Sequence, residues 1–397
     1  MTEFTVASFN VKNLIGPEQE YYRFQQYTPE EHAWKEDWLA DMLVRMNADV
    51  VGFQEIFELP ALQAVVDEAD RVGAASNADV VPGKDKKYRK RAIFRKLAYD
   101  SYSDAKIAFA PNANDGAPGQ RRPGVAILSR FGFVGTPEII QDLSPALQVA
   151  FDGGDAGHFK LDRLSRPVLK AVVPVGDQKI TVFNCHLKSK LGEFHRPEGA
   201  DFAPEADLTA YDPVGRALGA LRAATRRMAE AWVLRRLIVE ELEKGHPVMV
   251  MGDFNDSENA VSSEIIAGER PFKNYAWMLR HNARHAADRY KDEENEAIQK
   301  AIDKVRLESC EKLFVKKSLR DMVYTSAFGG VFESIDQLLV SRHFREGVHQ
   351  IGEMEYFTVF NDHLTDGSHP EAPYNKLASD HGQIMGHFRL LGRGSGS

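Results

Sequence analysis

Polar side chains that can bind a metal ion or a phosphate lie at the ends of several short apolar segments of this sequence. Because side chains alternate between the two faces of a strand, His186 and Lys188 are expected to share one face, and so are Asp253 and Asn255. Each pair would then face one site. The polar strand ends are Ser8-Phe9-Asn10, Gln54-Glu55, Asn184-Cys185-His186-Leu187-Lys188, Gly252-Asp253-Phe254-Asn255, Ser334-Ile335-Asp336 and Ser379-Asp380-His381-Gly382.

Each of these motifs has a common structural explanation when it stands alone. A single Glu after a strand is usually solvated, a single His is usually hydrogen-bonded in the core or at the surface, and Asp-Phe-Asn is a frequent turn signal. The sequence, however, carries suitable residue types at six strand ends in one order. This order favours one shared catalytic site.

The ordered motifs resemble those of the endonuclease/exonuclease/phosphatase superfamily, the deoxyribonuclease I-like metal-dependent phosphoesterases. The resemblance covers nearly the whole chain, from Asn10 to His381. It is specific for the superfamily and much less specific for a substrate. Its motifs are Phe-Asn-Val-Lys-Asn-Leu at 9–14, Gly-Phe-Gln-Glu-Ile at 52–56, Asn-Cys-His-Leu-Lys-Ser at 184–189, Gly-Asp-Phe-Asn-Asp at 252–256, Ile-Asp-Gln-Leu-Leu-Val-Ser at 335–341 and Ser-Asp-His-Gly at 379–382.

The resemblance implies a hard divalent cation, Mg²⁺ or alternatively Mn²⁺ or Ca²⁺. It places this cation near Asn10, Glu55 and Asp380, whose oxygen atoms are the ligands that such a cation prefers. Some relatives carry an acidic residue where Lys12 stands in this sequence.

The resemblance also implies roles for five catalytic residues. Asp253 and Asn255 match the pair that orients or deprotonates the attacking water and contacts the phosphate. His381 matches a histidine that stabilises charge on the phosphoryl group or carries a proton, and Asp336 matches its carboxylate partner. His186 matches a second histidine on the phosphate side. Positioning and electrostatic stabilisation do most of the catalysis in phosphoryl transfer, so water can attack in a single step without a covalent nucleophile.

Three basic residues are candidates for binding phosphate or substrate. Lys188 could add a positive charge beside His186. Arg122 precedes an apolar segment, as does Arg166, and both are expected near the mouth of the cleft.

The elements that position these residues follow from the apolar periodicity. Helical periodicity predicts helices at 31–46, 214–244 and 275–314. The turn at 176–178 predicts an antiparallel hairpin, so the sheets are mixed. We predict an α/β fold, a four-layer sandwich of two packed mixed β-sheets flanked by helices. Predicted strands cover 4–11, 50–54, 125–129, 168–175, 180–187, 248–252, 335–340 and 383–388.

Motifs that must converge on one site run from Asn10 to His381, so we predict a single catalytic domain over residues 1–391. The Gly- and Ser-rich residues 392–397 are expected to lie outside the fold as a tail. Residues 142–166 and 192–213 are expected to be irregular. Insertions between the strands are predicted near 76–123, 142–166, 192–213 and 270–317.

The composition excludes several classes of protein. The chain has 397 residues, of which 43% are hydrophobic and 27% charged, which is typical of a folded globular protein and not of a disordered, collagen-like or coiled-coil chain. No apolar stretch approaches the ~18 residues of a membrane span. The N-terminus lacks a basic segment followed by an apolar one, and the two cysteines do not indicate a disulfide framework. We therefore expect a cytoplasmic protein without a membrane span.

The charge distribution leaves the substrate class open. The basic run at 84–96 contains eight basic residues and one acidic residue, a local charge of +7, which favours DNA or RNA. The net charge of −8 and the insertions favour a small-molecule or lipid-headgroup phosphoester instead. A non-catalytic binding protein on the same fold is a third possibility, and the intact Glu55, Asp253 and His381 argue against it. The oligomeric state is not predicted.

Overall fold

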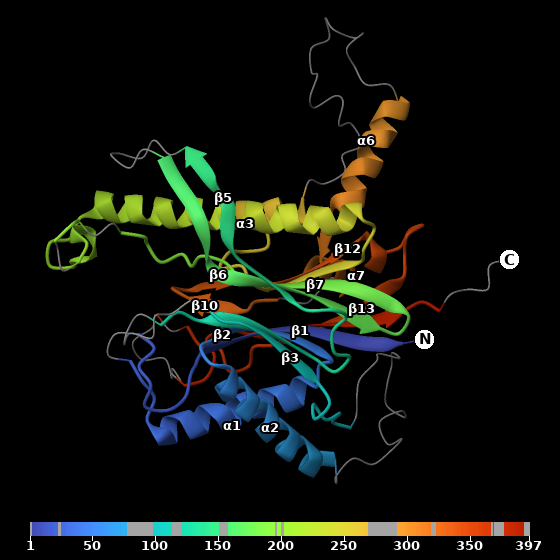
Figure 1. Ribbon diagram of the computed structural model, residues 1–397, viewed down its shortest axis with the longest axis horizontal. Helices are drawn as coiled ribbons and strands as arrows, with labels where there is room; N and C mark the ends of the chain where they lie inside the picture. Colours follow the sequence, from blue (N-terminus) through green and yellow to red (C-terminus); the bar gives the residue numbers. More distant parts are fainter. Residues whose placement is uncertain are drawn as a thin grey trace, which may run out of the picture.

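The computed structural model describes residues 2–22, 25–77, 98–112, 121–150, 158–194, 197–199, 202–268, 292–318, 323–366, 368 and 377–392. Two six-stranded sheets pack face to face, with helices on their outer sides (Figure 1). Each sheet contains parallel and antiparallel pairs. The predicted four-layer α/β sandwich is therefore confirmed. No helix in the described part of the chain is long and apolar enough to cross a membrane.

The first sheet has the strand order β13-β14-β1-β2-β4-β3, and α1 and α2 cover its outer face (Figure 1). Its central strands β1 and β2 are parallel, and the other neighbouring pairs are antiparallel. Thr28 and Glu31 form a capping box at the start of α1. The elements are β1 (Glu3–Leu14), α1 (Pro29–Met46), β2 (Val50–Ile56), α2 (Leu59–Ser76), β3 (Lys106–Ala110), β4 (Gly124–Ser129), β13 (Gly352–Phe360) and β14 (Gln383–Leu390).

The second sheet has the strand order β5-β6-β7-β8-β12-β9, and the long helix α3 lies across its outer face (Figure 1). Strands β7 and β8 are parallel, whereas the other neighbours are antiparallel. A separate hairpin pairs β10 with β11. The elements are β5 (Glu138–Ala150), β6 (His158–Val175), β7 (Gln178–His186), α3 (Pro213–Glu243), β8 (Val248–Asp253), α4 (Val261–Ala267), α6 (Asp292–Val305), β9 (Leu307–Ser309), α7 (Cys310–Ser318), β10 (Ser326–Phe328), β11 (Val331–Glu333) and β12 (Asp336–Ser341), with short 3-10 helices at Pro204–Ala206 and Arg342–Phe344.

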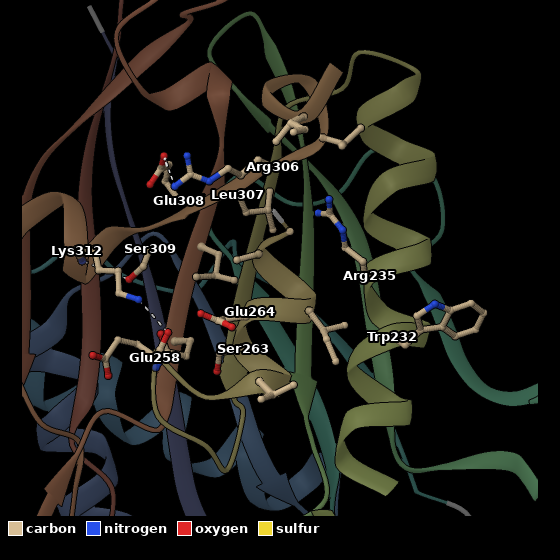
Figure 2. A pocket seen from close by; sticks show the side chains of 18 residues that line it. Trp232, Arg235, Glu258, Ser263, Glu264, Arg306, Leu307, Glu308, Ser309 and Lys312 are labelled. Atoms are coloured by element: carbon tan, nitrogen blue, oxygen red, sulfur yellow. Dashed lines mark hydrogen bonds and ion pairs between the residues drawn. The ribbon is translucent and has the colours of Figure 1, made fainter. Parts of the chain in front are cut away.

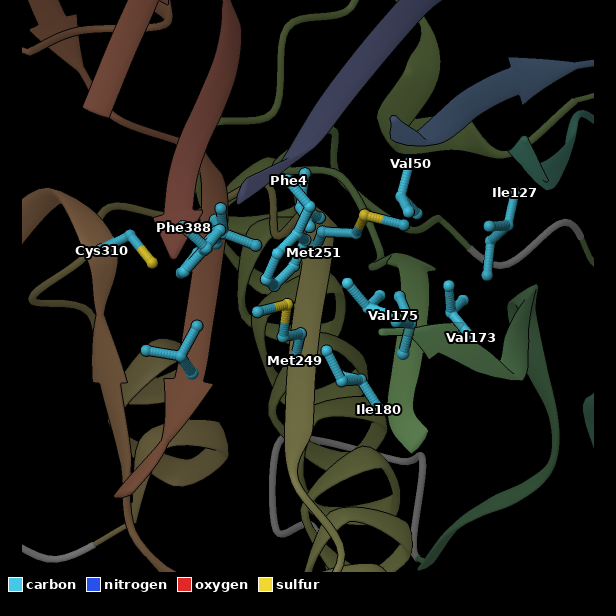
Figure 3. Packing of buried hydrophobic residues seen from close by; sticks show 14 of the residues in the cluster. Phe4, Val50, Ile127, Val173, Val175, Ile180, Met249, Met251, Cys310 and Phe388 are labelled. Carbon is cyan, nitrogen blue, oxygen red and sulfur yellow. The ribbon is translucent and has the colours of Figure 1, made fainter. Parts of the chain in front are cut away.

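The core between the sheets is built by inward-facing residues of both. Phe4 and Val50 of the first sheet meet Val173, Met249 and Met251 of the second in one buried cluster (Figure 3). Alternate residues of the same strands face outward and pack against the helices. Both faces of each sheet bury a row of apolar side chains, so a slip in the pairing of two strands would move these side chains out of place. Burial therefore fixes the register, and the register fixes which residues lie side by side at the strand ends.

Two of the three predicted helices are confirmed, at Pro29–Met46 and Pro213–Glu243, as is the hairpin of β6 and β7. The predicted helix at 275–314 is confirmed in its described part as the helices Asp292–Val305 and Cys310–Ser318, but it is wrong in being continuous. Residues Leu307–Ser309 form the edge strand β9, which pairs with β12 and separates α6 from α7. Edge pairing with an existing strand outweighs local helical periodicity over these three residues.

The expected irregular loop at 142–166 is also wrong. Its described residues belong to β5 and β6, which pair antiparallel as a long ribbon beside α3 (Figure 1). Leu161 and Leu164 of the ribbon are buried in the cluster under α3. The pairing register of β5 with β6 shifts between Ile140 and Asp142 and again before Leu147, so the apolar residues do not alternate regularly along the sequence. The basic run at 84–96 lies outside the described residues, as do 270–291 of the predicted 270–317 insertion.

Candidate active site

The predicted catalytic side chains lie where the inner faces of the two sheets turn from apolar to polar. On β1, Val6 faces the core between the sheets, and Asn10 follows on the same face. On β8, Asp253 follows Met251 on the face toward the same core. Asn10 Nδ2 donates a hydrogen bond to Asp253 Oδ2 at 3.1 Å, and both residues are buried. The pleat of two strands in different sheets thus brings these residues into contact.

Strand register gathers three more predicted residues around Asp253. His186 on β7 and Asp336 on β12 are the direct partners of Asp253 on either side of β8. His186 Nε2 lies 3.2 Å from Asp253 Oδ2. His381, just before β14, reaches across from the first sheet: its Nδ1 lies 2.9 Å from Asp336 Oδ2, and its Nε2 lies 3.8 Å from Asp253 Oδ2. These four side chains form one cluster, which we call the Asp253 cluster.

A tight turn after β8, and not strand alternation, joins Asn255 to Asp253. The Asn255 backbone has a φ of +52°, and its N–H donates to Asp253 Oδ1 at 2.7 Å. Asn255 Nδ2 donates to Leu187 O at 3.0 Å. The turn starts at Gly252, where φ is +146° and a Cβ would lie 2.0 Å from the backbone oxygen of Cys185. Only glycine fits this close approach of β8 to β7.

A β-bulge turns Glu55 toward the site. Strict alternation would place Glu55 on the outer face with Phe53, which packs among residues of α1 and α2. The pairing register of β2 shifts between Gln54 and Ile56, and Glu55 has a φ of +66°. As a result, Glu55 Oε1 lies 3.4 Å from Asn10 Nδ2.

Burial and charge shift the pKa values of the Asp253 cluster in different directions. Burial raises the pKa of Asp253 to about 7. Burial alone would lower the pKa of His381, but the carboxylates of Asp336 and Asp253 outweigh it and raise that pKa well above its usual value. Burial, with Arg166 and His381 as nearby cations, lowers the pKa of His186 far below its usual value. The cluster therefore combines a cationic His381, a neutral His186 and a carboxyl group that titrates near neutrality.

The Asp253 cluster contains one candidate metal site. Ligand atoms of Asp253, Asp336 and His381 all lie within 4.8 Å of one another. A metal ion binds the neutral form of an imidazole, however, and the two carboxylates favour the protonated form of His381. The hydrogen bond between His381 and Asp336 already pairs the imidazolium with one of the two carboxylates.

A second group, around Glu55, offers oxygen ligands. Asn13 donates its backbone N–H to Glu55 Oε2 at 3.0 Å, and its buried Oδ1 has no hydrogen-bond partner among the described residues. Asn10 adjoins Glu55, with its Oδ1 accepting the backbone N–H of Lys12 at 3.0 Å. Asp380, the third predicted ligand, lies at the same edge with its Oδ2 3.9 Å from Lys12 Nζ. A group that offers only oxygen ligands fits a hard cation better than the histidine-containing trio does.

Arg166 and Arg122 lie at the edge of the site. Arg166 donates from Nη1 to Leu187 O at 3.3 Å, close enough to His186 for its charge to lower the pKa of that histidine. Arg122 is exposed, and β4 begins two residues later, paired with the end of β2 that carries the bulge. The Arg166 guanidinium therefore lies at the site, and the backbone of Arg122 lies next to the strand that pairs with the bulged end of β2.

Lys188 does not join the Asp253 cluster. Strand β7 ends at His186, and Lys188 Nζ donates to Leu191 O at 2.9 Å in the loop that follows. The backbone N–H of Lys188 donates to Glu230 of α3 at 2.8 Å, as does the N–H of Ser165. Glu230 is buried and joins the middle of β6 to the loop after β7, a positioning role that its place in a helix did not reveal in the sequence.

Lys35 is a second residue that the sequence did not single out. It lies in α1 and is fully buried, with Nζ donating to Val11 O at 2.9 Å and to Leu377 O at 3.1 Å. Burial, with Lys12 as a nearby cation, lowers its pKa to about 7. Lys35 thus ties the strand that carries Asn10 to the segment that leads into Asp380. A lysine within a helical pattern gives no signal of such burial.

The cavity of about 730 Å³ between α3, α4, α6 and β9 is separate from this site (Figure 2). Trp232, Arg235 and Leu307 are among the residues that line it, and none of the predicted site residues does. Gln337 and Leu339 line it from the outer face of β12, whereas Asp336 faces the inner layer. The chemistry therefore belongs to the edge between the sheets and not to this cavity.

Several solved structures are similar to this chain. The catalytic domain of human Nocturnin, solved with a bound sulfate anion, has a TM-score of 0.50 and 12% identity, covering 98% of this chain and 95% of that chain. A family protein from Leptotrichia buccalis has a TM-score of 0.45 and 11% identity, covering 98% and 99%. Truncated TDP2 from Caenorhabditis elegans has a TM-score of 0.44 and 13% identity, covering 97% of each chain. The likeness to Nocturnin shows a shared fold.

The sequence also matches a family profile over most of its length. A search of curated proteins finds no significant match. The profile described as the Endonuclease/Exonuclease/phosphatase family matches residues 7–381. This range contains every strand end that contributes to the Asp253 cluster and to the Glu55 group. The chain therefore belongs to the endonuclease/exonuclease/phosphatase family.

Proposed function

We propose that the protein is a divalent-metal-dependent phosphodiesterase with nuclease-like activity. Family membership implies hydrolysis of a phosphoester bond. The observation that carries the proposal is the buried contact of Asp253 with Asn10, His186 and His381. In this contact, a carboxyl group with a pKa of about 7 lies beside the cationic ring of His381.

Asp253 is the group that accepts the proton of the attacking water. A carboxyl group with a pKa of about 7 is a stronger base than an ordinary aspartate and is still ionised at slightly alkaline pH. The N–H of Asn255 and the ring of His186 hold its two oxygens at 2.7 Å and 3.2 Å. Because His186 is neutral, it orients the carboxylate without cancelling its charge. Asn255 is thus a positioning residue for Asp253.

His381 stabilises the charge that develops on the phosphoryl oxygens. Asp336 holds its Nδ1 at 2.9 Å and keeps the ring protonated, so the Nε2 atom, which lies 3.8 Å from Asp253 Oδ2, also carries a proton that it can donate. Because this cationic donor is already in position, it can stabilise the negative charge of the phosphoryl oxygens in the transition state without reorganising, which lowers the barrier to hydrolysis.

Glu55, Asn10 and Asp380 would hold the cation, Mg²⁺ or alternatively Mn²⁺ or Ca²⁺. Asn13, whose backbone N–H donates to Glu55, supports a cation beside Glu55, because its buried Oδ1 has no hydrogen-bond partner within the part of the chain that the structure describes. When bound, the cation would act as a Lewis acid on the phosphoryl group and neutralise its charge.

Nucleic acid is the proposed substrate. The +7 run at 84–96 supports a polyanion, and Arg122 and Arg166 supply cations at the edge of the site. The test compares plasmid DNA with bis(p-nitrophenyl) phosphate over a salt series. Cleavage of DNA should fall roughly a hundredfold between low and moderate salt, because several phosphate contacts are lost, while the small diester is little affected.

Arg166→Ala should weaken DNA cleavage, whereas Arg226→Ala should not, because Arg226 is already paired with Glu193 at 2.8 Å. Faster turnover of the small ester, without a steep salt dependence on DNA, would contradict a nucleic-acid substrate.

A lipid-borne phosphoester is the second candidate, favoured by the hairpin of β10 and β11. Phe328 and Phe332 are 69% and 55% exposed on this hairpin. Its base is tied to the site, since the N–H of Gly382, beside His381, donates to Thr325 O at 2.7 Å. Release of phosphorylcholine from phosphatidylcholine vesicles, lost in Phe328→Ser but with bis(p-nitrophenyl) phosphate turnover retained, would favour this candidate.

A further inference from the structure

An aromatic cluster lies beside the catalytic edge of the first sheet. It consists of Tyr21, Tyr22, Tyr27 and Phe57, and we call it the tyrosine cluster. The ring of Tyr21 lies 5.2 Å from Tyr27 and 5.9 Å from Phe57, and these three side chains are buried. The backbone N–H of Tyr21 donates to Gln25 O at 3.1 Å, and the N–H of Gln25 donates to Tyr22 O at 2.9 Å. These two hydrogen bonds hold the backbone of Tyr21 and Tyr22 in place. The cluster is therefore a fixed support and not a set of free side chains.

Tyr22 is the exposed member of this cluster. Its side chain is 37% exposed, and it makes edge-on contacts with the rings of Tyr21 at 5.4 Å and Phe57 at 6.1 Å. Packing of this kind fixes the ring of Tyr22. When a flat partner stacks on the ring, the Tyr22 side chain therefore loses little conformational entropy.

The tyrosine cluster adjoins the catalytic residues through the backbone. Phe57 follows Glu55 by two residues, and Tyr27 Oη donates to Lys12 O at 3.4 Å. Burial raises the pKa of Tyr22 to about 12, with Glu55 raising it and Arg166 lowering it. Tyr22 is thus a neutral ring. Its contact with the ring of Phe57, which follows the end of β2, places it beside the strand end that carries Glu55.

We propose that Tyr22 is the platform on which a nucleobase next to the scissile phosphate stacks. The proposal rests on the nuclease-like function proposed above and deepens it. A neutral, supported aromatic ring accepts any base, because every base has a π face, and stacking is worth roughly 1–3 kcal/mol per base. Recognition of this kind fixes the position of the substrate without reading its sequence.

The test uses two esters that share a p-nitrophenyl leaving group. One is the p-nitrophenyl ester of thymidine 5′-phosphate, and the other is the same ester of a 1,2-dideoxyribose 5-phosphate, which lacks only the base. Tyr22→Leu should raise KM for the thymidine ester about tenfold with little change in kcat, and should leave the abasic ester unaffected. Tyr22→Phe should retain the wild-type KM, because the ring remains. Tyr211→Ala removes an exposed tyrosine packed against Arg216 and serves as the matched control.

The outcomes separate the platform from the proposed function. Equal effects of Tyr22→Leu on both esters, or none, would overturn the platform while the phosphodiesterase stands. A fall in kcat on both esters would show that Tyr22 supports the fold of the site instead. Hydrolysis of neither ester by the wild-type protein would overturn the proposed function, and the platform with it.

Discussion

At Asp253, neighbours of different charge set the properties of a single carboxyl group. Asn10 and Asn255 donate neutral hydrogen bonds to it, His186 contributes a neutral ring, and His381 contributes a cation. The sequence predicted that His186, Asp253 and His381 share a site, because strand ends carry them. The contribution of Asn255 as a support for Asp253 depends on a left-handed turn that no residue spacing reveals.

The charges around Asp253 predict a bell-shaped pH dependence of kcat/KM. Activity requires ionised Asp253, so it should rise as the pH increases toward and above the pKa of about 7, and it should fall at high pH as His381 loses its proton. Asp336→Asn removes a negative charge from both groups, so both limbs should shift to lower pH, with kcat reduced about 100-fold. The exposed Asp362→Asn is the control and should shift neither limb. Limbs that stay in place in Asp336→Asn would contradict these assignments.

At the scale of elements, strands with one buried face were predictable and irregular ones were not. The inward apolar rows of β1, β7 and β8 predicted both the strands and the residues at their ends. The β2 bulge that turns Glu55 inward, the ribbon of β5 and β6 with its shifted register, and the three-residue edge strand β9 depend on pairing with distant segments. Lys35 was missed for the same reason, since its partners Val11 and Leu377 come from other elements.

The close approach of β7 and β8 makes a prediction about Gly252. A Cβ there would lie 2.0 Å from Cys185 O, so Gly252→Ala must separate the strands that carry His186 and Asp253. We expect a loss of more than ~3 kcal/mol in the free energy of unfolding, measured by urea denaturation, and loss of activity. Gly135→Ala is the matched control, because Gly135 also has positive φ, at +73°, but has nothing within 4 Å of its Cβ position. It should cost only the backbone strain, on the order of 1 kcal/mol. Equal losses in the two variants would show that the collision does not matter.

At the scale of the whole molecule, the site exists only because the two sheets are closed against each other. Asn10 and Glu55 belong to the first sheet, Asp253 and Asp336 belong to the second, and His381 spans the edge between them. The order of motifs along the chain predicted this convergence. The substrate was not predictable in the same way, because recognition depends on loops such as the one that carries Tyr22, which the strand pattern does not describe.

The central claim is that Asp253 acts with a bound divalent cation to hydrolyse a phosphodiester. The most direct test measures turnover of bis(p-nitrophenyl) phosphate by the chelator-treated protein during titration with Mg²⁺, for the wild type, for Asp253→Asn and for the exposed control Asp162→Asn. We predict no turnover before Mg²⁺ is added, full recovery in the wild type and the control, and a loss of at least ~100-fold in Asp253→Asn at every concentration. Turnover that survives chelation, or near-wild-type turnover by Asp253→Asn, would contradict the account.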